Sequence, residues 1–294
     1  MSTSTIATAH REGTAGPIAD ATATYTSAAT GHTAVALVDG MGHDPAIVRL
    51  APMLAESAAR AGAQVGVLGG LLHAGVLARD PGPDAVGVLA VLRKDGTAQV
   101  AWAGDCRAYH WDGTSLAQLT TDHNLAAYLT KSARGAGEVP VSALADYVGV
   151  TLGLALPAAT PFVAAPAGGL LILTSDGVHD QAPDSVLESL VREHEGTPQA
   201  LADALVAAAE PTAAGYRDDA TAVVVHRGAG AGRERLLSPE SAMRLGELSS
   251  MARRELESPA RERVLDAIYQ VMHSPTADHS FALMTALRGT GLSW

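Results

Sequence analysis

The order of apolar and polar positions predicts two kinds of element that alternate along the chain. Short apolar or alternating runs bounded by Gly, Asp or Asn predict strands. They lie at residues 21–27, 33–39, 85–92, 98–103, 108–111, 116–119, 170–174 and 221–226. Apolar residues spaced three and four apart predict helices, which lie at residues 45–61, 65–79, 183–194 and 198–209.

Turn residues predict how the strands connect. Thr30-Gly31-His32 predicts a hairpin that joins the first two strands. Asp-Gly and Gly-Asp pairs between the four strands of residues 85–119 predict a meander of antiparallel hairpins. Residues 1–16 are rich in Thr, Ser, Ala and Gly, and we expect them to be frayed.

Two stretches fall outside this pattern. Residues 121–147 are polar and contain no clear strand, and an excursion of this length is usually functional or mobile. Residues 228–232 form a Gly/Ala linker, and residues 234–294 are charged with a helical pattern. We therefore expect one domain at residues 1–228 and a helical extension at 229–294, which packs on the domain, binds a partner or self-associates.

Composition excludes several classes of function. Hydrophobic residues make up 47% of the chain and aromatic residues 4%, so the core must be built from Ala, Val and Leu. The net charge of −11 argues against a nucleic-acid binder. Cys106 is the only cysteine, which excludes an internal disulfide and a thiolate zinc cluster. The sequence shows neither a signal-peptide pattern nor a membrane span, and we expect a cytoplasmic protein.

Three aspartates have matching surroundings that suggest a shared chemistry. Asp39 and Asp176 each end an apolar run just before a glycine, and Asp218 immediately precedes the apolar strand at 220–225. Such positions can gather at one rim of a pair of sheets and form a site made only of oxygen ligands. That chemistry favours Mg²⁺ or Mn²⁺ over zinc. The alternative is that all three are ordinary turn residues.

Six ordered motifs show a resemblance to a known family, the metal-dependent type 2C (PPM) Ser/Thr protein phosphatases of bacteria. The motifs are Val38-Asp39-Gly40-Met41-Gly42, Ala103-Gly104-Asp105-Cys106-Arg107-Ala108-Tyr109, Gln118-Leu119-Thr120-Thr121-Asp122-His123, Thr151-Leu152-Gly153, Thr174-Ser175-Asp176-Gly177 and Arg217-Asp218-Asp219-Ala220-Thr221. The resemblance implies an α+β fold, a four-layer α-β-β-α sandwich of two antiparallel sheets flanked by helix pairs. It also implies that the excursion at 121–147 is a flap beside the metal centre.

The resemblance also assigns ligands and a reaction. It implies that Asp39 bridges two core cations, Mn²⁺ or Mg²⁺, and that the Gly40 carbonyl binds the second one. Asp176 and Asp218 would bind the first cation, and Asp105 a third, weaker one. Two cations that flank a water lower its pKa, and the resulting hydroxide attacks phosphorus in line. The implied activity is hydrolysis of phosphoserine and phosphothreonine in a partner protein.

The chain departs from the family pattern at its first motif. Asp20 matches the family aspartate and is a further candidate metal ligand, but Ala19 stands where the second-metal glutamate belongs. Ala15 stands where the phosphate-gripping arginine belongs. Arg11 lies four residues earlier and is an alternative source of that positive charge.

Two further departures concern charge and proton transfer. Asp219 replaces the usual asparagine and adds a negative charge near the site. Met41 holds the position of a general-acid histidine of some relatives, and His43 is the nearest substitute. The alternative for His43 is a cap at the start of the helix.

These departures leave two hypotheses. The first is an active metal-dependent phosphatase with a loosened second metal and a weak phosphate grip. The second is a degenerate phosphatase fold that acts as a binding or regulatory module with weak or no catalysis. Retention of the four aspartates at 39, 105, 176 and 218 favours the first.

Overall fold

The chain divides into two compact units, Met1–Gly230 and Ala231–Trp294. The structure is a computed structural model, and it describes residues 4–78, 82–94, 96–131, 144, 147–156, 160–166, 168–227, 239–257, 259–273, 283, 286, 287 and 290.

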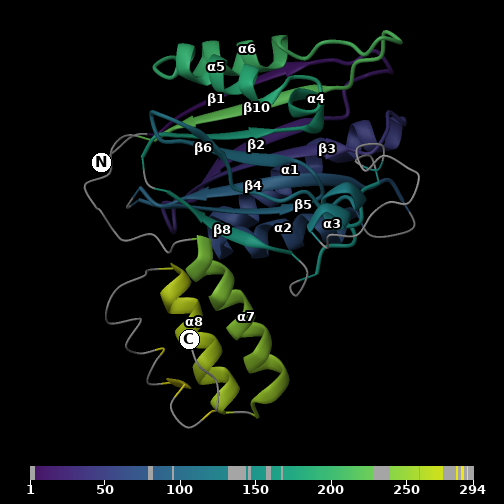
Figure 1. The fold of residues 1–294 in the computed structure, drawn as a ribbon. Helices are drawn as coiled ribbons and strands as arrows, with labels where there is room; N and C mark the ends of the chain where they lie inside the picture. Colours follow the sequence, from purple (N-terminus) through teal and green to yellow (C-terminus); the bar gives the residue numbers. More distant parts are fainter. Residues whose placement is uncertain are drawn as a thin grey trace. The chain divides into compact units, whose positions relative to one another are not determined.

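The first unit contains two five-stranded antiparallel sheets that stack face to face (Figure 1). The first sheet has the order β1-β10-β9-β6-β7. Its strands are β1 (Thr5–Arg11), β10 (Ala220–His226), β9 (Leu170–Thr174), β6 (Arg107–Trp111) and β7 (Leu116–Gln118). The second sheet has the order β2-β3-β4-β5-β8. Its strands are β2 (Ala21–Thr26), β3 (Thr33–Gly40), β4 (Ala85–Leu92), β5 (Ala98–Ala103) and β8 (Phe162–Ala165).

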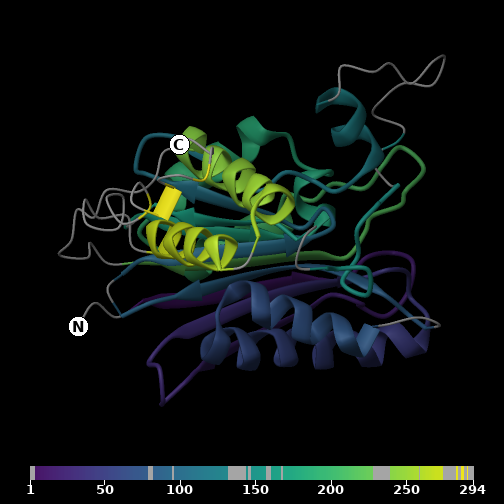
Figure 2. The same ribbon diagram turned by 90° about the horizontal axis from the view of Figure 1, so that it is seen from below.

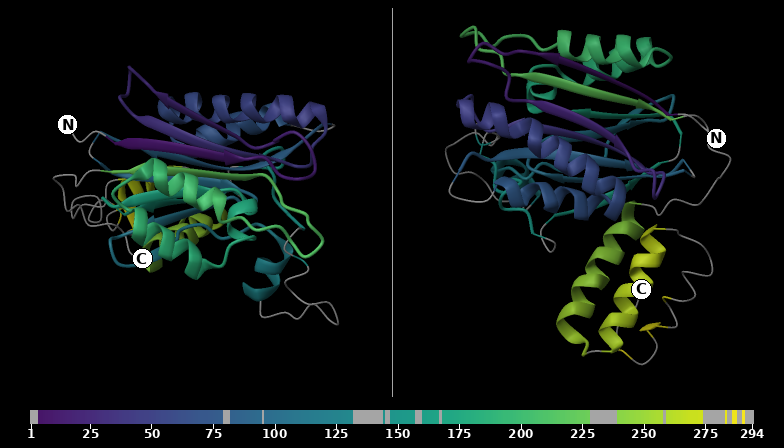
Figure 3. Two further views of the ribbon diagram at one scale, coloured as in Figure 1. Left: turned by 90° about the horizontal axis from the view of Figure 1, so that it is seen from above. Right: turned by 180° about the vertical axis from the view of Figure 1, so that it is seen from behind.

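Helix pairs cover the outer faces of both sheets, which gives the predicted four layers (Figures 2 and 3). On the second sheet lie α1 (Pro45–Val65) and α2 (Val67–Gly75), followed by the 3₁₀ turn η1 (Val76–Ala78). On the first sheet lie α5 (Asp184–His194) and α6 (Pro198–Ala207). Two short helices, α3 (Leu125–Lys131) and α4 (Asp176–His179), lie in connections between strands.

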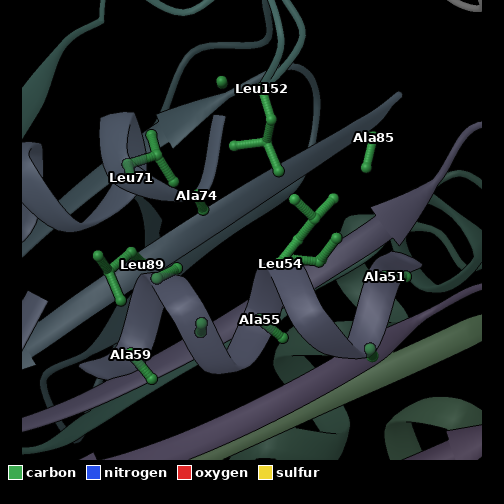
Figure 4. Close-up of a cluster of buried hydrophobic side chains, with 14 of the residues drawn as sticks. Ala51, Leu54, Ala55, Ala59, Leu71, Ala74, Ala85, Leu89 and Leu152 are labelled. Atoms are coloured by element: carbon green, nitrogen blue, oxygen red, sulfur yellow. The ribbon is translucent and has the colours of Figure 1, made fainter. Parts of the chain in front are cut away.

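The longest helix, α1, begins where the sequence predicts. The Asp44 side chain accepts a hydrogen bond from the Ala46 amide at 2.8 Å, and Pro45 occupies the first turn. The buried face of α1 carries mostly alanines around Leu54, and it packs with Leu71, Leu89 and Leu152 in one apolar cluster (Figure 4). Because these side chains are small, the helix lies close to the sheet without aromatic residues.

A second apolar layer fills the space between the two sheets. Every residue of β4 is buried, and its Val88 faces this layer together with Leu37, Val100 and Leu173. Cys106 is fully buried in the same layer, where it packs as a small apolar residue. Strands covered on both faces read as continuous apolar runs, which explains why these strands were readily predicted.

The strand arrangement corrects two predictions. Residues 5–11 are not frayed, because they form β1, which pairs with β10 from Thr5 opposite His226 to Arg11 opposite Ala220. The predicted meander is correct for the hairpins β4–β5 and β6–β7. It is wrong between β5 and β6, because β5 pairs with β8 in the second sheet and β6 pairs with β9 in the first. Strand β8 was not predicted, and it supplies the outer edge of the second sheet.

The helix predicted at 65–79 is shorter than expected. It ends as α2 at Gly75, and Val76, which lies within the predicted range, is exposed in η1. His73, on α2, is exposed. The excursion at 121–147 contains α3, whereas Gly135, Gly137 and Pro140 lie outside the described residues.

The second unit has a core of its own. Helices α7 (Pro239–Glu255) and α8 (Ala260–His273) bury apolar residues of the predicted helical pattern, together with residues from the segment that follows. The buried residues include Leu245, Leu248, Val264, Ile268, Leu283 and Leu287. The linker at 228–232 and the side chains of Val271 and Met272 lie outside the described part of the chain. Among the residues that were searched, none of the helices is long and apolar enough to cross a membrane.

Candidate metal centre

The predicted metal-binding aspartates lie at one end of the sandwich. Antiparallel pairing places the end of β3 beside the start of β2, and the end of β9 beside the start of β10. The loop from β5 to β6 crosses from the second sheet to the first at this same end. We call the aspartates gathered here the acidic cluster, which consists of Asp20, Asp39, Asp105, Asp176 and Asp218.

The members of the acidic cluster perturb one another. Burial raises the pKa of Asp39 well above its usual range, and the charges of Asp20, Asp176 and Asp105 raise it further. Burial and the charges of Asp105, Asp218 and Asp20 do the same to Asp176. A hydrogen bond between the Asp39 and Asp176 carboxyl groups raises the pKa of Asp39 further. When no cation is bound, protonation of part of this cluster is therefore favoured.

Asp20 is a buried member of the acidic cluster, and one of its two carboxylate oxygens has no hydrogen-bond partner. Its side chain is 7% exposed, and Oδ2 accepts a hydrogen bond from the Ser175 hydroxyl at 2.8 Å. Oδ1 is buried and has no hydrogen-bond partner. Burial raises the pKa of Asp20 to about 7, and burial likewise raises the pKa of Asp105 to about 6. A buried, unpartnered carboxylate oxygen is costly unless a cation or a proton satisfies it.

Asp218 is held by its own neighbourhood. Its Oδ2 accepts a hydrogen bond from the Tyr216 hydroxyl at 2.8 Å, and its Oδ1 accepts one from the Asp219 amide at 2.9 Å. Asp218 as a whole residue is half-buried, as are Asp39 and Asp176. Burial is nevertheless the main cause of the raised pKa of the Asp39 and Asp176 carboxyl groups.

The donor set fits hard divalent cations, although the side chains are not already arranged around one. Among the described residues, no three His, Cys, Asp or Glu side chains form a ready-made metal site. The carboxyl groups instead raise one another's pKa, bind hydroxyl groups or, at Asp20 Oδ1, stay unpartnered. All the available donors are oxygens, which Mg²⁺ and Mn²⁺ prefer. A bound cation would give the buried Asp20 Oδ1 a partner and would reduce the repulsion among the carboxylates of the acidic cluster.

The departures from the family pattern have structural consequences. Ala19 is buried in the apolar cluster under α1, so no polar group replaces the missing glutamate there. Ala15 is exposed. The alternative that Arg11 supplies the missing positive charge is wrong, because its Nη1 donates to the carbonyls of Ala207 and Ala209, both at 3.0 Å. Arg11 caps the end of α6.

His43 lies at the margin of the acidic cluster. Its Nδ1 is 3.3 Å from the Pro17 carbonyl oxygen and 3.6 Å from Asp219 Oδ2. The alternative that His43 caps α1 is wrong, since Asp44 is the N-cap. Met41, at the position of the family general acid, is half exposed.

One structural residue of the site carried no sequence signal. Asp84 precedes β4, and its carboxylate accepts hydrogen bonds from the Thr151 hydroxyl and, at 2.9 Å, from the Gly153 amide. Its carbonyl oxygen accepts a hydrogen bond from the Met41 amide at 3.1 Å. Asp84 therefore fastens the Thr-Leu-Gly motif to the turn after Asp39. Only the tertiary structure brings these segments together.

The other end of the excursion is fastened beside Asp105. The His123 amide donates to the Gly104 carbonyl at 2.9 Å, and the Gly104 amide donates to His123 Nδ1 at 3.2 Å. The His123 ring stacks on Trp102, with 5.8 Å between ring centroids. Arg107 forms an ion pair with Asp122, with 2.7 Å between Nη2 and Oδ2. Both ends of the excursion thus meet turns that carry acidic-cluster residues.

Comparison with known proteins identifies the fold. No protein-family model and no curated protein sequence matches the chain. Among solved structures, it is similar to the Ser/Thr phosphatase Stp1 from Staphylococcus aureus, with a TM-score of 0.62 and 18% identity over 77% of this chain and 95% of that one. The chain is also similar to the PPM phosphatase MsPP from Mycobacterium smegmatis, in complex with cacodylate, with a TM-score of 0.61 and 20% identity over 76% of this chain and 98% of that one. For the phosphatase PstP/Ppp from Mycobacterium tuberculosis, the TM-score is 0.55 and the identity 18%, over 78% of this chain and 100% of that one. The chain therefore has the fold of the bacterial PPM Ser/Thr phosphatases.

Proposed function

We propose that this protein hydrolyses phosphoserine and phosphothreonine in proteins with the help of Mg²⁺ or Mn²⁺. The observation that carries the proposal is the acidic cluster, whose five carboxyl groups come from both sheets and meet at one end. Grouping like charges without a cation is unfavourable, and perturbed carboxyl groups gathered at one place are typical of functional sites. The PPM fold makes phosphate chemistry the first expectation for such a site.

In this proposal Asp39, Asp176 and Asp218, with the Gly40 carbonyl, hold two cations, and Asp105 with Asp176 holds a third. When bound, the cations lower the pKa of water and neutralise charge on the phosphate oxygens. The neighbouring polar groups orient the carboxylates, because Ser175 fixes Asp20 Oδ2 and Tyr216 fixes Asp218 Oδ2.

The substrate class follows from the fold and the chemistry of the site. A neighbouring PPM structure holds cacodylate, a tetrahedral oxyanion like a phosphate. The excursion at 121–147 and the segment after it carry exposed Tyr128, Tyr147 and Leu154. Hydrogen bonds of His123 and Gly153 join the same segments to turns of the acidic cluster. Exposed apolar and aromatic side chains on such segments favour a protein substrate over a small metabolite.

A second candidate function is favoured by the replacements at the first motif. Ala15 and Ala19 remove a positive charge and a carboxylate, and Arg11 is engaged at the end of α6. A PPM fold with a weakened site could bind a phosphoprotein or a regulatory partner without turnover. Under this alternative the acidic cluster would be a remnant.

Hydrolysis of a small aryl phosphate across Mn²⁺ and Mg²⁺ titrations tests the proposal. We expect metal-dependent turnover that is absent in Asp39→Ala. The matched control is Asp112→Asn, which changes an Asp-Gly pair at the other end of the sandwich and should keep wild-type turnover. A folded wild-type protein with no turnover above the Asp39→Ala blank would favour the binding module.

Metal binding separates the two functions without requiring turnover. We expect Mn²⁺ binding by calorimetry in the wild-type protein and loss of at least one ion in Asp176→Asn. Indistinguishable binding by the two proteins would contradict the proposed role of the acidic cluster.

A further inference from the structure

A groove runs beside the first half of α1, and we call it the α1 groove. Its volume is about 360 Å³. Residues three and four apart on α1 form one wall, and η1 with the segment that follows it forms the other. Because residues with this spacing share one face of a helix, the first wall is a continuous stripe of α1. The walls include Ala46, Arg49, Leu50 and Met53 on one side and Leu77 and Pro83 on the other.

Large apolar side chains of the α1 groove are open to solvent. Met53 is 58% exposed and Leu77 is 48% exposed, whereas Leu54 and Ala55 of the same helix lie in the buried apolar cluster (Figure 4). Neighbouring apolar side chains that remain exposed are typical of a surface that binds another molecule. Methionine is flexible and adapts to differently shaped partners, which suits a surface that binds varied side chains.

Arg49 gives the α1 groove a positive charge. It is exposed and forms no ion pair with another residue of the described part of the chain. The carboxylates next to the two walls are already engaged, because Asp44 caps α1 and Asp84 binds residues 151 and 153. An unpaired guanidinium beside an apolar surface is complementary to a segment that carries a carboxylate next to an apolar side chain.

The α1 groove lies beside the turn that follows Asp39. Pro83 directly precedes Asp84, whose carbonyl oxygen accepts a hydrogen bond from the Met41 amide of that turn at 3.1 Å. The other wall begins with Ala46, in the first turn of the helix that follows the same turn. An extended chain advances about 3.3 Å per residue. A polypeptide whose phosphorylated residue reaches the acidic cluster can therefore place residues a few positions away in the α1 groove.

The size of the α1 groove favours a short segment over a second copy of the chain. Ligand pockets in proteins enclose about 300–1,000 Å³, and this groove is at the lower end of that range. A stable interface between two proteins buries about 1,200–2,000 Å², which requires far more surface than a groove of this size provides. An apolar side chain with a neighbouring carboxylate matches it better.

We propose that the α1 groove binds a segment of the phosphoprotein substrate that flanks the phosphorylated residue. An apolar side chain of this segment packs between Met53 and Leu77, and an acidic residue beside it pairs with Arg49. This inference rests on the proposed phosphatase function, because it assigns substrate specificity to the surroundings of that site.

Nuclear magnetic resonance of the full chain with ¹³C-methyl-labelled methionine tests binding without turnover. The probes are unphosphorylated threonine peptides of one length, in which a leucine–glutamate pair is moved along a background of serine and glycine. We expect the Met53 methyl signal, assigned with Met53→Leu, to shift with at least one of these peptides and not with the background peptide. Met251, in α7 of the second unit, is the control and should not shift.

Two outcomes of this experiment would overturn the proposal. One is a Met53 signal that no leucine–glutamate peptide moves more than the background peptide does. The other is a Met53 signal that changes with protein concentration and not with peptide, which would assign the α1 groove to a second copy of the chain.

Kinetics with the phosphothreonine forms of the same peptides provide a second test. The best-placed leucine–glutamate pair should raise kcat/KM about tenfold over the background peptide, the size expected from burying one apolar side chain. Met53→Ser should remove most of this preference. Val65→Ser, which changes a 70% exposed residue in the last turn of the same helix, should keep it. A preference that Met53→Ser leaves unchanged would overturn the proposal.

A charge exchange tests the part of Arg49. The wild type should prefer the leucine–glutamate peptide to a leucine–lysine peptide by about two- to fivefold in kcat/KM, as expected for an exposed ion pair. Arg49→Glu should reverse this preference, an exchange that a merely structural role would not produce. The same preference in both proteins would overturn the pairing with Arg49.

The two proposals can fail separately. A wild-type protein that hydrolyses none of the phosphopeptides would count against the phosphatase function, while the Met53 signal would still report on the α1 groove. Turnover of the phosphopeptides without any preference for the leucine–glutamate pair would leave the phosphatase function intact and remove only this inference.

Discussion

The Asp-Gly pairs at the two ends of the sandwich have the same sequence and opposite physical chemistry. At the β6–β7 turn, Asp112 is exposed, and Oδ1 accepts from the Thr114 amide at 2.7 Å and from the Ser115 amide at 2.9 Å. These hydrogen bonds, with one from the Thr114 hydroxyl, lower the pKa of Asp112 to about 2. At the other end, burial and neighbouring carboxylates raise the pKa of Asp39 and Asp176 well above the usual range.

The comparison shows that the dipeptide alone does not distinguish a turn from a site. Backbone amides surround Asp112 and stabilise its charge locally. Asp176 follows a buried strand and meets carboxylates from distant parts of the chain. An aspartate that is stabilised locally is structural, whereas one that is destabilised by its surroundings is a candidate for function.

Removing the charge at Asp39 should have the largest effect. We expect Asp39→Asn to weaken Mn²⁺ binding more than ~100-fold, beyond the loss seen when an outer partner of a metal ligand is removed. Because the variant also relieves repulsion, its melting temperature in a chelator should exceed that of the wild type. Thermal unfolding with and without Mn²⁺ measures both effects. A metal-dependent rise in melting temperature as large as in Asp112→Asn would contradict this prediction.

The acidic cluster should make the metal-free protein less stable as pH rises. The folded pKa of Asp20 is about 7, against 3.8 for an exposed aspartate. Between these values the folded state holds a proton that the unfolded state has lost, so the free energy of unfolding falls with pH. The contribution of Asp20 is about 4 kcal/mol across this window. Denaturation in a chelator at pH 4.5 and about 7 measures it, with Asp20→Asn as the control that flattens the slope. A free energy of unfolding that rises between these two pH values would contradict the raised pKa of Asp20.

The glycines of the two pairs should also respond differently. A Cβ at Gly177 would lie 2.1 Å from the Asp219 carbonyl oxygen, so Gly177→Ala should cost about 3 kcal/mol. Gly113 has open space around it but a φ of +96°, so Gly113→Ala should cost about 1 kcal/mol. Urea denaturation of both variants gives the difference. Equal losses in the free energy of unfolding would contradict the expectation that close packing around Gly177 makes a Cβ more costly there than at Gly113.

The smallest effect should come from Asp112. Its lowered pKa stabilises the folded state above pH 3.8, and this contribution is lost as pH falls through about 2. Asp112→Asn should therefore melt slightly below the wild type at pH 7 and equal it near pH 2. Calorimetry at both pH values tests this. A difference in melting temperature that is larger near pH 2 than at pH 7 would contradict the prediction.

The acidic cluster could be anticipated in part, because a similar local pattern surrounds two of its members. Asp39 and Asp176 each end a continuous apolar run before a glycine, so strand, turn and carboxylate are all readable in a few residues. The helix start at Asp44 was equally local, because a cap acts within one turn. What the sequence could not give is whether these side chains are close enough to perturb one another.

The missed features all depend on distant partners. Strand β1 is short and rich in Thr and Ala, and it is stabilised by pairing with β10 more than two hundred residues later. The separation of β5 and β6 into different sheets depends on how the two sheets stack. Asp84 carried no sequence signal, and Asp219 was noted only for the charge that it adds, because the amides that they bind come from remote segments.

The pairing of β1 with β10 has a consequence for the connectivity of the first unit. Thr5 lies opposite His226, so the start of β1, the first strand of this unit, lies beside the end of β10, its last strand. A circular permutant could therefore join residue 227 to residue 4 by a short linker and open the chain within the Asp112–Ser115 turn. Every segment that bears the acidic cluster would remain intact in such a chain. The order of the strands in the sequence would change, while their order in the sheets would not.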